Sequence, residues 1–275
     1  MLPDSLNRLL IRLARKCSFG QRMEESVRSR ILNSAELFAR ENVRAEDFFI
    51  IGYPKSGHTW FQNLVAGIVF GVDPELAPDA LIQTVVPDLE YERFYRRFST
   101  PMFFKSHRMP APAYRRVIYL LRDGRDAMVS YYHYMCGRAG GAIDFMSMVR
   151  NGDHALFKWH EHVDRWLDNP FNARMMVVKY EDMLEDPVAA LEKFCGFVGI
   201  ERSTDDLSAI AIKCSFEKMR KKEMKFGWRQ PWPTDRYFIR RGKAGSFEDE
   251  MPAAVLEAFM AQSRRTLLRA GYLSD

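Results

Sequence analysis

The feature that most constrains the fold is a glycine-containing turn between a short apolar strand and a helix. Residues 48–51 are Phe-Phe-Ile-Ile, an uncharged aromatic and β-branched run that is typical of a buried parallel strand. The segment Tyr53 to Trp60 (Y-P-K-S-G-H-T-W) follows, and Thr59 to Phe70 is predicted to be helical. Free N–H groups from Ser56 to Thr59 would favour an anion, and Lys55 adds a positive charge. The turn therefore predicts a site for a phosphorylated ligand; an ordinary strand-to-helix turn with a surface lysine is the alternative.

This turn differs from the common loop that binds nucleoside triphosphates, G-x-x-x-x-G-K-[ST]. In that loop the lysine follows the second glycine, and the hydroxyl beside it binds Mg²⁺. Here Lys55 precedes Gly57, and the aromatic residue Trp60 stands in the first helical turn. We therefore expect phosphate binding without an obligatory metal, and a flat aromatic face for a nucleotide base.

Length and composition fit one large globular domain. The chain has 275 residues, of which 47% are hydrophobic and 28% charged, a balance that excludes wholesale disorder and a fibrous architecture. The formal charge of +5 comes from 41 basic and 36 acidic residues. A polyanionic small ligand would explain this modest excess as well as nucleic acid would.

The cysteines and apolar runs indicate a cytoplasmic protein without a transmembrane segment. No C-x-x-C pair occurs, so neither a zinc site nor a disulfide framework is expected. The apolar run from Leu64 to Val72 is about half of the roughly 20 residues that a spanning helix needs. Residues 1–45 are expected to form an N-terminal helical region, because four leucines recur at helical spacing among arginines: Leu6, Leu9, Leu10 and Leu13. That helix either packs on the protein or a partner, or makes peripheral contact with a membrane.

Strands and helices alternate along the rest of the chain. Further strands are predicted at Met102–Lys105, Val117–Leu121 and Met175–Lys179, and later helices at Val188–Val198 and Pro252–Ala270. The pattern predicts one α/β domain with a central, mostly parallel sheet flanked by helices. In such sheets ligands bind where strands end, so Lys55, His107 and Arg122 are expected to share one edge. Residues 73–88 are predicted to be a loop, and residues 218–247 a long basic and aromatic loop that could form a lid.

Two more basic clusters point to a ligand with two phosphate groups. Arg122 at a strand end is followed two helical turns later by Ser130, and both suit a phosphate. Residues 240–242 are Arg-Arg-Gly, in which glycine allows close approach of the backbone. Taken alone, the first cluster could be a helix cap involving Asp126, and the second a solvated loop. Their co-occurrence with the phosphate turn favours a doubly phosphorylated nucleotide.

With these motifs in this order, the sequence resembles the sulfotransferase superfamily. It is most similar in motif to the cytosolic sulfotransferases that use 3′-phosphoadenosine-5′-phosphosulfate (PAPS). The resemblance covers roughly residues 48–245 and implies a sulfotransferase domain over residues 46–275. It implies that Tyr53 to Trp60 bind the 5′-phosphosulfate, and that Arg122 and Ser130, an R-(x)7-S motif, bind the 3′-phosphate. The donor-binding residues that it implies are Lys55, Ser56, Gly57, His58, Thr59, Trp60, Arg122, Ser130, Tyr180, Phe216, Arg240, Arg241 and Gly242.

The same resemblance implies roles in catalysis. Residues 105–107, Lys-Ser-His, match a K-T/S-H segment in which the histidine takes a proton from the acceptor hydroxyl or amine. A free imidazole titrates near pH ~6.5, so His107 could act as this base at neutral pH. Lys55 would neutralise charge on the leaving 5′-phosphate, and Lys105 would hold the sulfuryl oxygens. Adenosine 3′,5′-bisphosphate (PAP) would be the nucleotide product, and no metal would be required.

Several positions depart from the family pattern. His58 stands where the common motif has Thr, and Cys214 replaces a Thr near the nucleotide. Residues 246–248 are Ser-Phe-Glu in place of D-W-K, and the family's dimerisation motif is not recognisable, so the oligomeric state stays open. His160 and His162 alternate on a predicted helix and point apart, which argues against a zinc site.

The acceptor is not identified by the sequence. Aromatic residues in segments 73–97, 134–145 and 222–238 suggest an aromatic or lipid-like acceptor, but loops that fold over the nucleotide would have the same composition. One rival hypothesis is a kinase-like phosphotransferase, against which the missing G-K-[ST] and Mg²⁺ carboxylate argue. The other is a non-catalytic nucleic-acid-binding module that uses the basic loop. No nucleic-acid motif is recognisable, so no nucleic-acid partner is expected.

Overall fold

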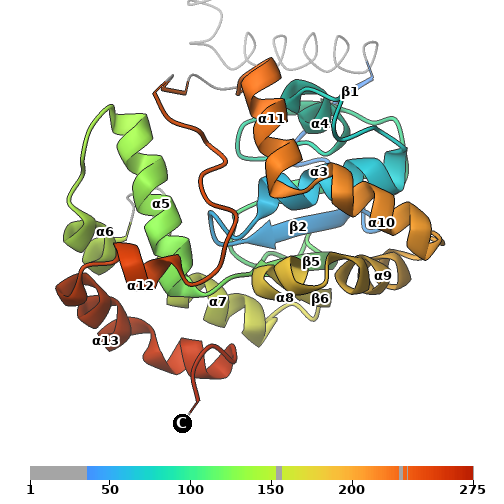
Figure 1. Ribbon diagram of the computed structural model, residues 1–275. Helices are drawn as coiled ribbons and strands as arrows, with labels where there is room; N and C mark the ends of the chain where they lie inside the picture. The colour runs from blue at the N-terminus through green and yellow to red at the C-terminus, as the bar shows by residue number, and fades with distance from the viewer. Residues whose placement is uncertain (1–35, 153–156, 229–231, 234, 275) are drawn as a thin grey trace, which may run out of the picture.

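A parallel sheet forms the centre of the computed structural model, which describes residues 36–152, 157–228, 232–233 and 235–274 (Figure 1). Its strand order is β4 (Phe103–Ser106), β2 (Phe48–Gly52), β5 (Arg116–Leu121) and β6 (Arg174–Lys179). All three neighbouring pairs are parallel, with Ile50 opposite both Lys105 and Ile118. The predicted α/β class and its strands are confirmed, each within one or two residues at its ends.

Helices cover both faces of this sheet. On one face the cluster around Ile50 and Leu120 packs against α3 (His58–Phe70), α8 (Tyr180–Glu185), α9 (Pro187–Val198) and α10 (Thr204–Lys213). On the other face the cluster around Ile51 and Tyr119 packs against α5 (Gly124–Ala139), α6 (Phe145–Asn151), α7 (Trp159–Asp168) and α13 (Ala253–Arg269). Figure 1 shows α5 and α13 on one side of the molecule and α3, α9 and α10 on the other. Burial of β2, β4 and β5 on both faces explains their continuous apolar runs, whereas the edge strand β6 is only partly buried.

The parallel arrangement places four functional segments at one edge of the sheet. The phosphate turn follows β2, His107 follows β4, Arg122 follows β5, and Tyr180 follows β6 as the first residue of α8. Carboxyl ends of parallel strands lie at the same edge, so these residues converge although they are far apart in sequence. The expectation that Lys55, His107 and Arg122 share an edge is confirmed.

Two predicted loops contain helices instead. The segment 73–88 includes α4 (Asp79–Val85), because Ile82 is buried against Ala66 and Ala77, and Pro78 precedes the helix rather than interrupting it. The basic segment 218–247 begins with α11 (Phe216–Phe226) and ends at α12 (Ser246–Glu250). In α11 the Lys222 ammonium is buried and donates to the Asn63 side chain and the Pro74 carbonyl, so this part of the predicted loop is wrong.

The prediction of a helical N-terminal region is wrong for the part that is described. β1 (Leu37–Ala39) is a strand, paired antiparallel with β3 (Phe94–Arg96), which the sequence analysis did not predict. The predicted helix with its four leucines lies outside the described residues. Of the helices in the described ranges, none combines the length and the apolarity needed to cross a membrane.

A buried ion pair anchors the start of the central strand. Asp47, just before β2, is 0% exposed, and its carboxylate accepts two hydrogen bonds from Arg97, at 2.7 and 3.0 Å. It also accepts the backbone N–H groups of Arg44 at 2.7 Å and Met102 at 2.9 Å. Burial opposes ionisation, but these donors outweigh it and hold the pKa of Asp47 below its usual value. The carboxylate thus joins the segments that enter β2 and β4.

Replacing Asp47 should destabilise the domain strongly. Asp47→Ala leaves the Arg97 guanidinium buried without its partner, so we expect a loss of about 3–5 kcal/mol in the free energy of unfolding, measured with urea. The exposed pair Arg40–Glu41 provides the control, since Glu41→Ala should leave stability nearly unchanged. Because the folded-state pKa of Asp47 is lowered, its contribution should be present above its unfolded pKa and disappear as pH falls through the folded value. Equal stabilities of the two variants would contradict this assignment.

Candidate active site

The turn after β2 has the backbone geometry of an anion-binding loop. Lys55 and Gly57 have positive φ angles of 70° and 97°, which curl the chain before α3 begins at His58. A Cβ atom on Gly57 would lie 2.9 Å from the Tyr180 ring, so a glycine is needed there. No side chain caps the N-terminus of α3, and its first turn contains no acidic residue. The N–H groups of this helix start are therefore available to an anion.

Several buried polar atoms around this turn have no hydrogen-bond partner among the described residues. They include the Ser56 hydroxyl, both ring nitrogens of His58, Trp60 Nε1, Arg122 Nε and the Ser246 hydroxyl. Buried polar groups are nearly always paired in folded proteins. Such a concentration of unpaired polar atoms, most of them donors, is what a site for a polar, anionic ligand requires.

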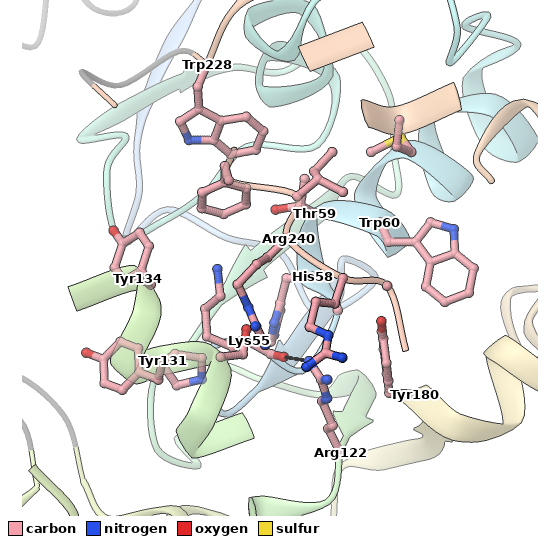
Figure 2. A pocket seen from close by; sticks show the side chains of 18 of the residues that line it. Lys55, His58, Thr59, Trp60, Arg122, Tyr131, Tyr134, Tyr180, Trp228 and Arg240 are labelled. Carbon is pink, nitrogen blue, oxygen red and sulfur yellow. Dashed lines mark hydrogen bonds between the residues drawn. The ribbon is translucent and has the colours of Figure 1, made fainter. Parts of the chain in front are cut away.

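A cavity of about 530 Å³ opens over the turn and the strand ends. Every residue assigned from the sequence to the donor or to catalysis lines it, except two buried residues of the turn motif, Tyr53 and Ser56. Figure 2 shows Lys55, His58, Arg122 and Arg240 close together, with Trp60 and Tyr180 to one side and Tyr134 and Trp228 to the other. The volume lies in the range of small-molecule sites. The cavity thus has a cationic centre between two aromatic regions.

Arg122 is held in place by two backbone carbonyl groups, one in the phosphate turn and one just after the Arg-Arg-Gly segment at 240–242. Its guanidinium donates to the carbonyl oxygens of Lys55 at 3.0 Å and Lys243 at 3.2 Å, and lies 4.2 Å from the centre of the Tyr180 ring. The alternative interpretation of this segment, a helix cap in which Asp126 takes part, is right only in part. Asp126 is 3.7 Å from Arg122, but it also accepts the N–H groups of Gly245 at 2.8 Å and Phe247 at 2.9 Å.

The three aromatic residues assigned to adenine, Trp60, Tyr180 and Phe216, all line the cavity. The Trp60 ring meets the Tyr180 ring edge-on with centroids 5.8 Å apart. Phe216 lies against Gly242, whose φ is 61° and where a Cβ atom would come within 2.3 Å of the ring. Cys214, which departs from the family pattern, is buried in this wall, and burial raises the pKa of its thiol to about 12. The thiol is therefore neutral and a weaker donor than a hydroxyl.

The two arginines of the basic loop share an acidic partner that the sequence analysis missed. Glu250 in α12 pairs with Arg240 at 2.5 Å and also with Arg241. Burial opposes ionisation of Glu250, but both guanidinium groups outweigh it and lower its pKa to about 2. Only the tertiary position of α12 reveals this pairing, because Glu250 lies among other acidic residues in the sequence.

The His107 ring is oriented by a backbone carbonyl group and presents one free ring nitrogen to the cavity. Its Nδ1 lies 2.8 Å from the Gly52 carbonyl oxygen, which can only accept, so Nδ1 carries the proton and Nε2 is left as the acceptor. Burial and the nearby Lys105 lower the pKa of His107 to about 4. The imidazole is consequently unprotonated at neutral pH.

Side chains of α7 fix the loop that carries His107. His162 lies 3.1 Å from the His107 carbonyl oxygen through Nε2 and 3.0 Å from the Tyr119 hydroxyl through Nδ1. Trp166 donates to the Arg108 carbonyl at 3.0 Å. From the sequence alone, His162 was only a candidate metal ligand. Its nitrogens are both engaged, and no group of three His, Cys, Asp or Glu residues in the described ranges could hold a metal.

The two lysines of the site differ in whether an acidic side chain lies beside them. Lys105 is buried and pairs with Asp88 at 2.6 Å, a partner that the sequence analysis did not identify. Lys55 instead faces rings, with its ammonium 3.9 Å from the centre of Phe238 and 4.8 Å from that of Tyr134. Burial, followed by the charges of Lys105, Arg122 and Arg240, lowers the pKa of Lys55 to about 7. Lys55 is thus the cation that an anionic ligand would stabilise most.

Comparison with known proteins agrees with this architecture. The guinea-pig (Cavia porcellus) 3-alpha-hydroxysteroid sulfotransferase is 27% identical over 236 residues, covering 79% of this chain and 82% of its own length. Human sulfotransferase 4A1 is 28% identical over 195 residues, covering 65% of this chain and 69% of its own.

Solved structures share the fold. A retinol dehydratase crystallised with androsterone and PAP matches with a TM-score of 0.66 at 21% identity, covering 82% of this chain and 81% of that one. Mouse sulfotransferase SULT7A1 in complex with PAP matches with a TM-score of 0.58 at 21% identity, covering 81% and 86%. The family model of the sulfotransferase domain matches residues 45–270. The chain therefore belongs to the sulfotransferase family, as its motifs implied.

Proposed function

We propose that this enzyme transfers a sulfuryl group from PAPS to a hydroxyl or amine of an acceptor. The observation that carries the proposal is the convergence of the phosphate turn, Arg122 and His107 on one cavity. The family match favours this reaction over the kinase-like alternative. No described feature favours a nucleic-acid-binding module.

The residues of the cavity fit a nucleotide with phosphate at both positions. The turn and Lys55 would bind the 5′-phosphosulfate, as the unpaired donors and the uncapped start of α3 suggest. Arg122 and Ser130, both in the cavity wall, would bind the 3′-phosphate, with Arg240 and Arg241 above it. Trp60, Tyr180 and Phe216 would hold the adenine. The two solved structures described above contain PAP, which supports this assignment.

Each catalytic side chain has a task in an in-line displacement. PAPS supplies an activated sulfuryl group whose S–O bond to the 5′-phosphate breaks as the acceptor oxygen or nitrogen bonds to sulfur. His107 Nε2 takes the proton that the acceptor loses. Lys55 neutralises the charge that the leaving phosphate gains, and Lys105, fixed by Asp88, lies beside His107 to hold sulfuryl oxygens.

The far side of the cavity suits an apolar acceptor that carries a hydroxyl group. Trp228 and Phe238 stack with centroids 3.9 Å apart, and Tyr134 meets Phe238 edge-on at 6.0 Å. The guinea-pig relative is named for a hydroxysteroid, and a fold neighbour was crystallised with androsterone. We propose a ring-bearing or lipid-like alcohol or phenol as the acceptor class.

Removing Arg122 should weaken PAP binding selectively. Loss of a charged contact to the 3′-phosphate should raise the Kd of PAP roughly 10- to 100-fold in Arg122→Ala. Adenosine 5′-monophosphate, which lacks that phosphate, should bind the native chain and the variant alike. Isothermal titration calorimetry with EDTA present measures both affinities and tests whether metal is needed.

A second arginine variant controls for lost charge. Arg165, on the exposed face of α7, does not line the cavity, so Arg165→Ala should leave PAP affinity unchanged. Equal affinity of the native chain for the two nucleotides would contradict the proposed donor site.

Binding of PAP should drive proton uptake by Lys55. With a pKa of about 7, this amine is mostly neutral at pH ~8, and a bound phosphate would raise its pKa towards the ordinary value. The phosphates of PAP are already deprotonated at that pH, since their second pKa is about 6. We expect uptake of about one proton per PAP, seen as a dependence of binding enthalpy on the ionisation enthalpy of the buffer. Lys55→Met should abolish the uptake, and a buffer-independent native enthalpy would contradict it.

Replacing His107 should stop transfer without affecting donor binding. His107→Gln removes the proton acceptor, so the rate of sulfuryl transfer from PAPS to 2-naphthol, a phenolic probe, should fall about 10²- to 10⁴-fold. The Kd of PAP should stay near the native value. His160 contacts Ser263 outside the cavity, so His160→Gln should transfer at the native rate. Substantial transfer by His107→Gln would rule out His107 as the general base.

A further inference from the structure

His58 occupies a position in the turn where the family motif has threonine. It is the first residue of α3, its side chain lines the cavity, and it is only 4% exposed. Neither ring nitrogen has a hydrogen-bond partner among the described residues. A buried imidazole with two unpaired polar atoms facing a cavity indicates that a ligand supplies the missing contact.

The ring lies directly beside the proposed base. The centroids of His58 and His107 are 4.3 Å apart, with the rings nearly perpendicular. Both pack against Gly52: His107 Nδ1 donates to its carbonyl, and a Cβ atom on this glycine would lie 3.0 to 3.2 Å from the His58 ring. The backbone of Gly52 thus sets the positions of the two imidazoles relative to each other.

The surroundings keep His58 neutral. Burial has the largest effect, and His107, Lys105, His162 and Lys55 all disfavour a further positive charge. Together they lower the pKa of His58 well below its usual value. A neutral imidazole carries one N–H donor, which can serve an anionic oxygen without adding a proton that the base would compete for.

We infer that His58 is a further catalytic residue, whose neutral imidazole donates an N–H hydrogen bond to a sulfuryl oxygen of PAPS. This inference rests on the proposed function. His107 must lie beside the acceptor atom that attacks sulfur, so the ring in contact with His107 lies at the sulfuryl end of the donor rather than at the 3′-phosphate. During transfer His107 receives the acceptor proton, the 5′-phosphate leaves with the electron pair of the broken S–O bond, and His58 keeps its proton throughout.

A matched pair of variants tests this role. His58→Leu removes the donor and retains a buried side chain, whereas His58→Gln retains an amide N–H donor. Transfer from saturating PAPS to 2-naphthol should fall roughly 10- to 100-fold in His58→Leu, the usual effect of losing a hydrogen bond to a charged group. It should stay within about threefold of native in His58→Gln. PAP lacks the sulfuryl group, so its Kd should stay near native in both variants, which also verifies that they fold.

The other outcomes would overturn the inference. Equal rates in the two variants would make the imidazole a space-filling side chain. A loss of PAP affinity in His58→Leu that matches the loss of rate would place the contact on the 5′-phosphate or reveal damage to the turn. If His58→Leu does not fold, His58→Ala replaces it in the same comparison with His58→Gln. Failure of the native chain itself to bind PAP and turn over PAPS would instead reject the proposed function, so the two failures are distinguishable.

Discussion

The site depends on concentrating positive charge where little water reaches it. Lys55, Lys105, Arg122 and Arg240 converge on one cavity, and three of them have acidic partners: Asp88 beside Lys105, Asp126 beside Arg122, and Glu250 beside Arg240. Desolvation and mutual repulsion disfavour the charged state of Lys55, whose pKa falls to about 7. An anionic ligand removes that penalty. The same electrostatic arrangement therefore destabilises the free site and favours donor binding.

Rigid neighbours hold these charges in place. Gly52 anchors His107 through its carbonyl, while His162 and Trp166 on α7 hold the carbonyl groups of His107 and Arg108. Residues from β2 and α7 thereby position the imidazole that follows β4. All three contacts end on backbone carbonyl groups, so they fix the chain at Gly52, His107 and Arg108. Such support is what a base needs to meet an acceptor atom at hydrogen-bonding distance.

The sequence predicted the parts of the structure that local pattern determines. Apolar runs located the strands of the central sheet, and short motifs located residues that the fold brings to one cavity. Tertiary context decided the rest. The segment with Pro78 forms α4 because Ile82 has a buried contact to make. The basic segment forms α11, in which the Lys222 ammonium is buried against Asn63 and the Pro74 carbonyl. Asp88, Glu250 and His162 carry no motif of their own, so their pairing with Lys105, Arg240 and the His107 loop could only come from the structure.

Histidine in place of the family's threonine at position 58 is compatible with the proposed sulfuryl transfer, because burial and the neighbouring cations keep its ring neutral. An imidazole beside the base would compete for protons if its pKa were ordinary, and a protonated ring would repel Lys55 and Lys105. Burial among cations removes that competition by keeping His58 neutral. A threonine hydroxyl can rotate to follow an oxygen, whereas the imidazole directs its N–H from a ring packed on Gly52 and His107. In the role proposed for His58, the substitution would replace an adaptable donor with a preorganised one, which stabilises the transition state if charge builds on the sulfuryl oxygens during transfer.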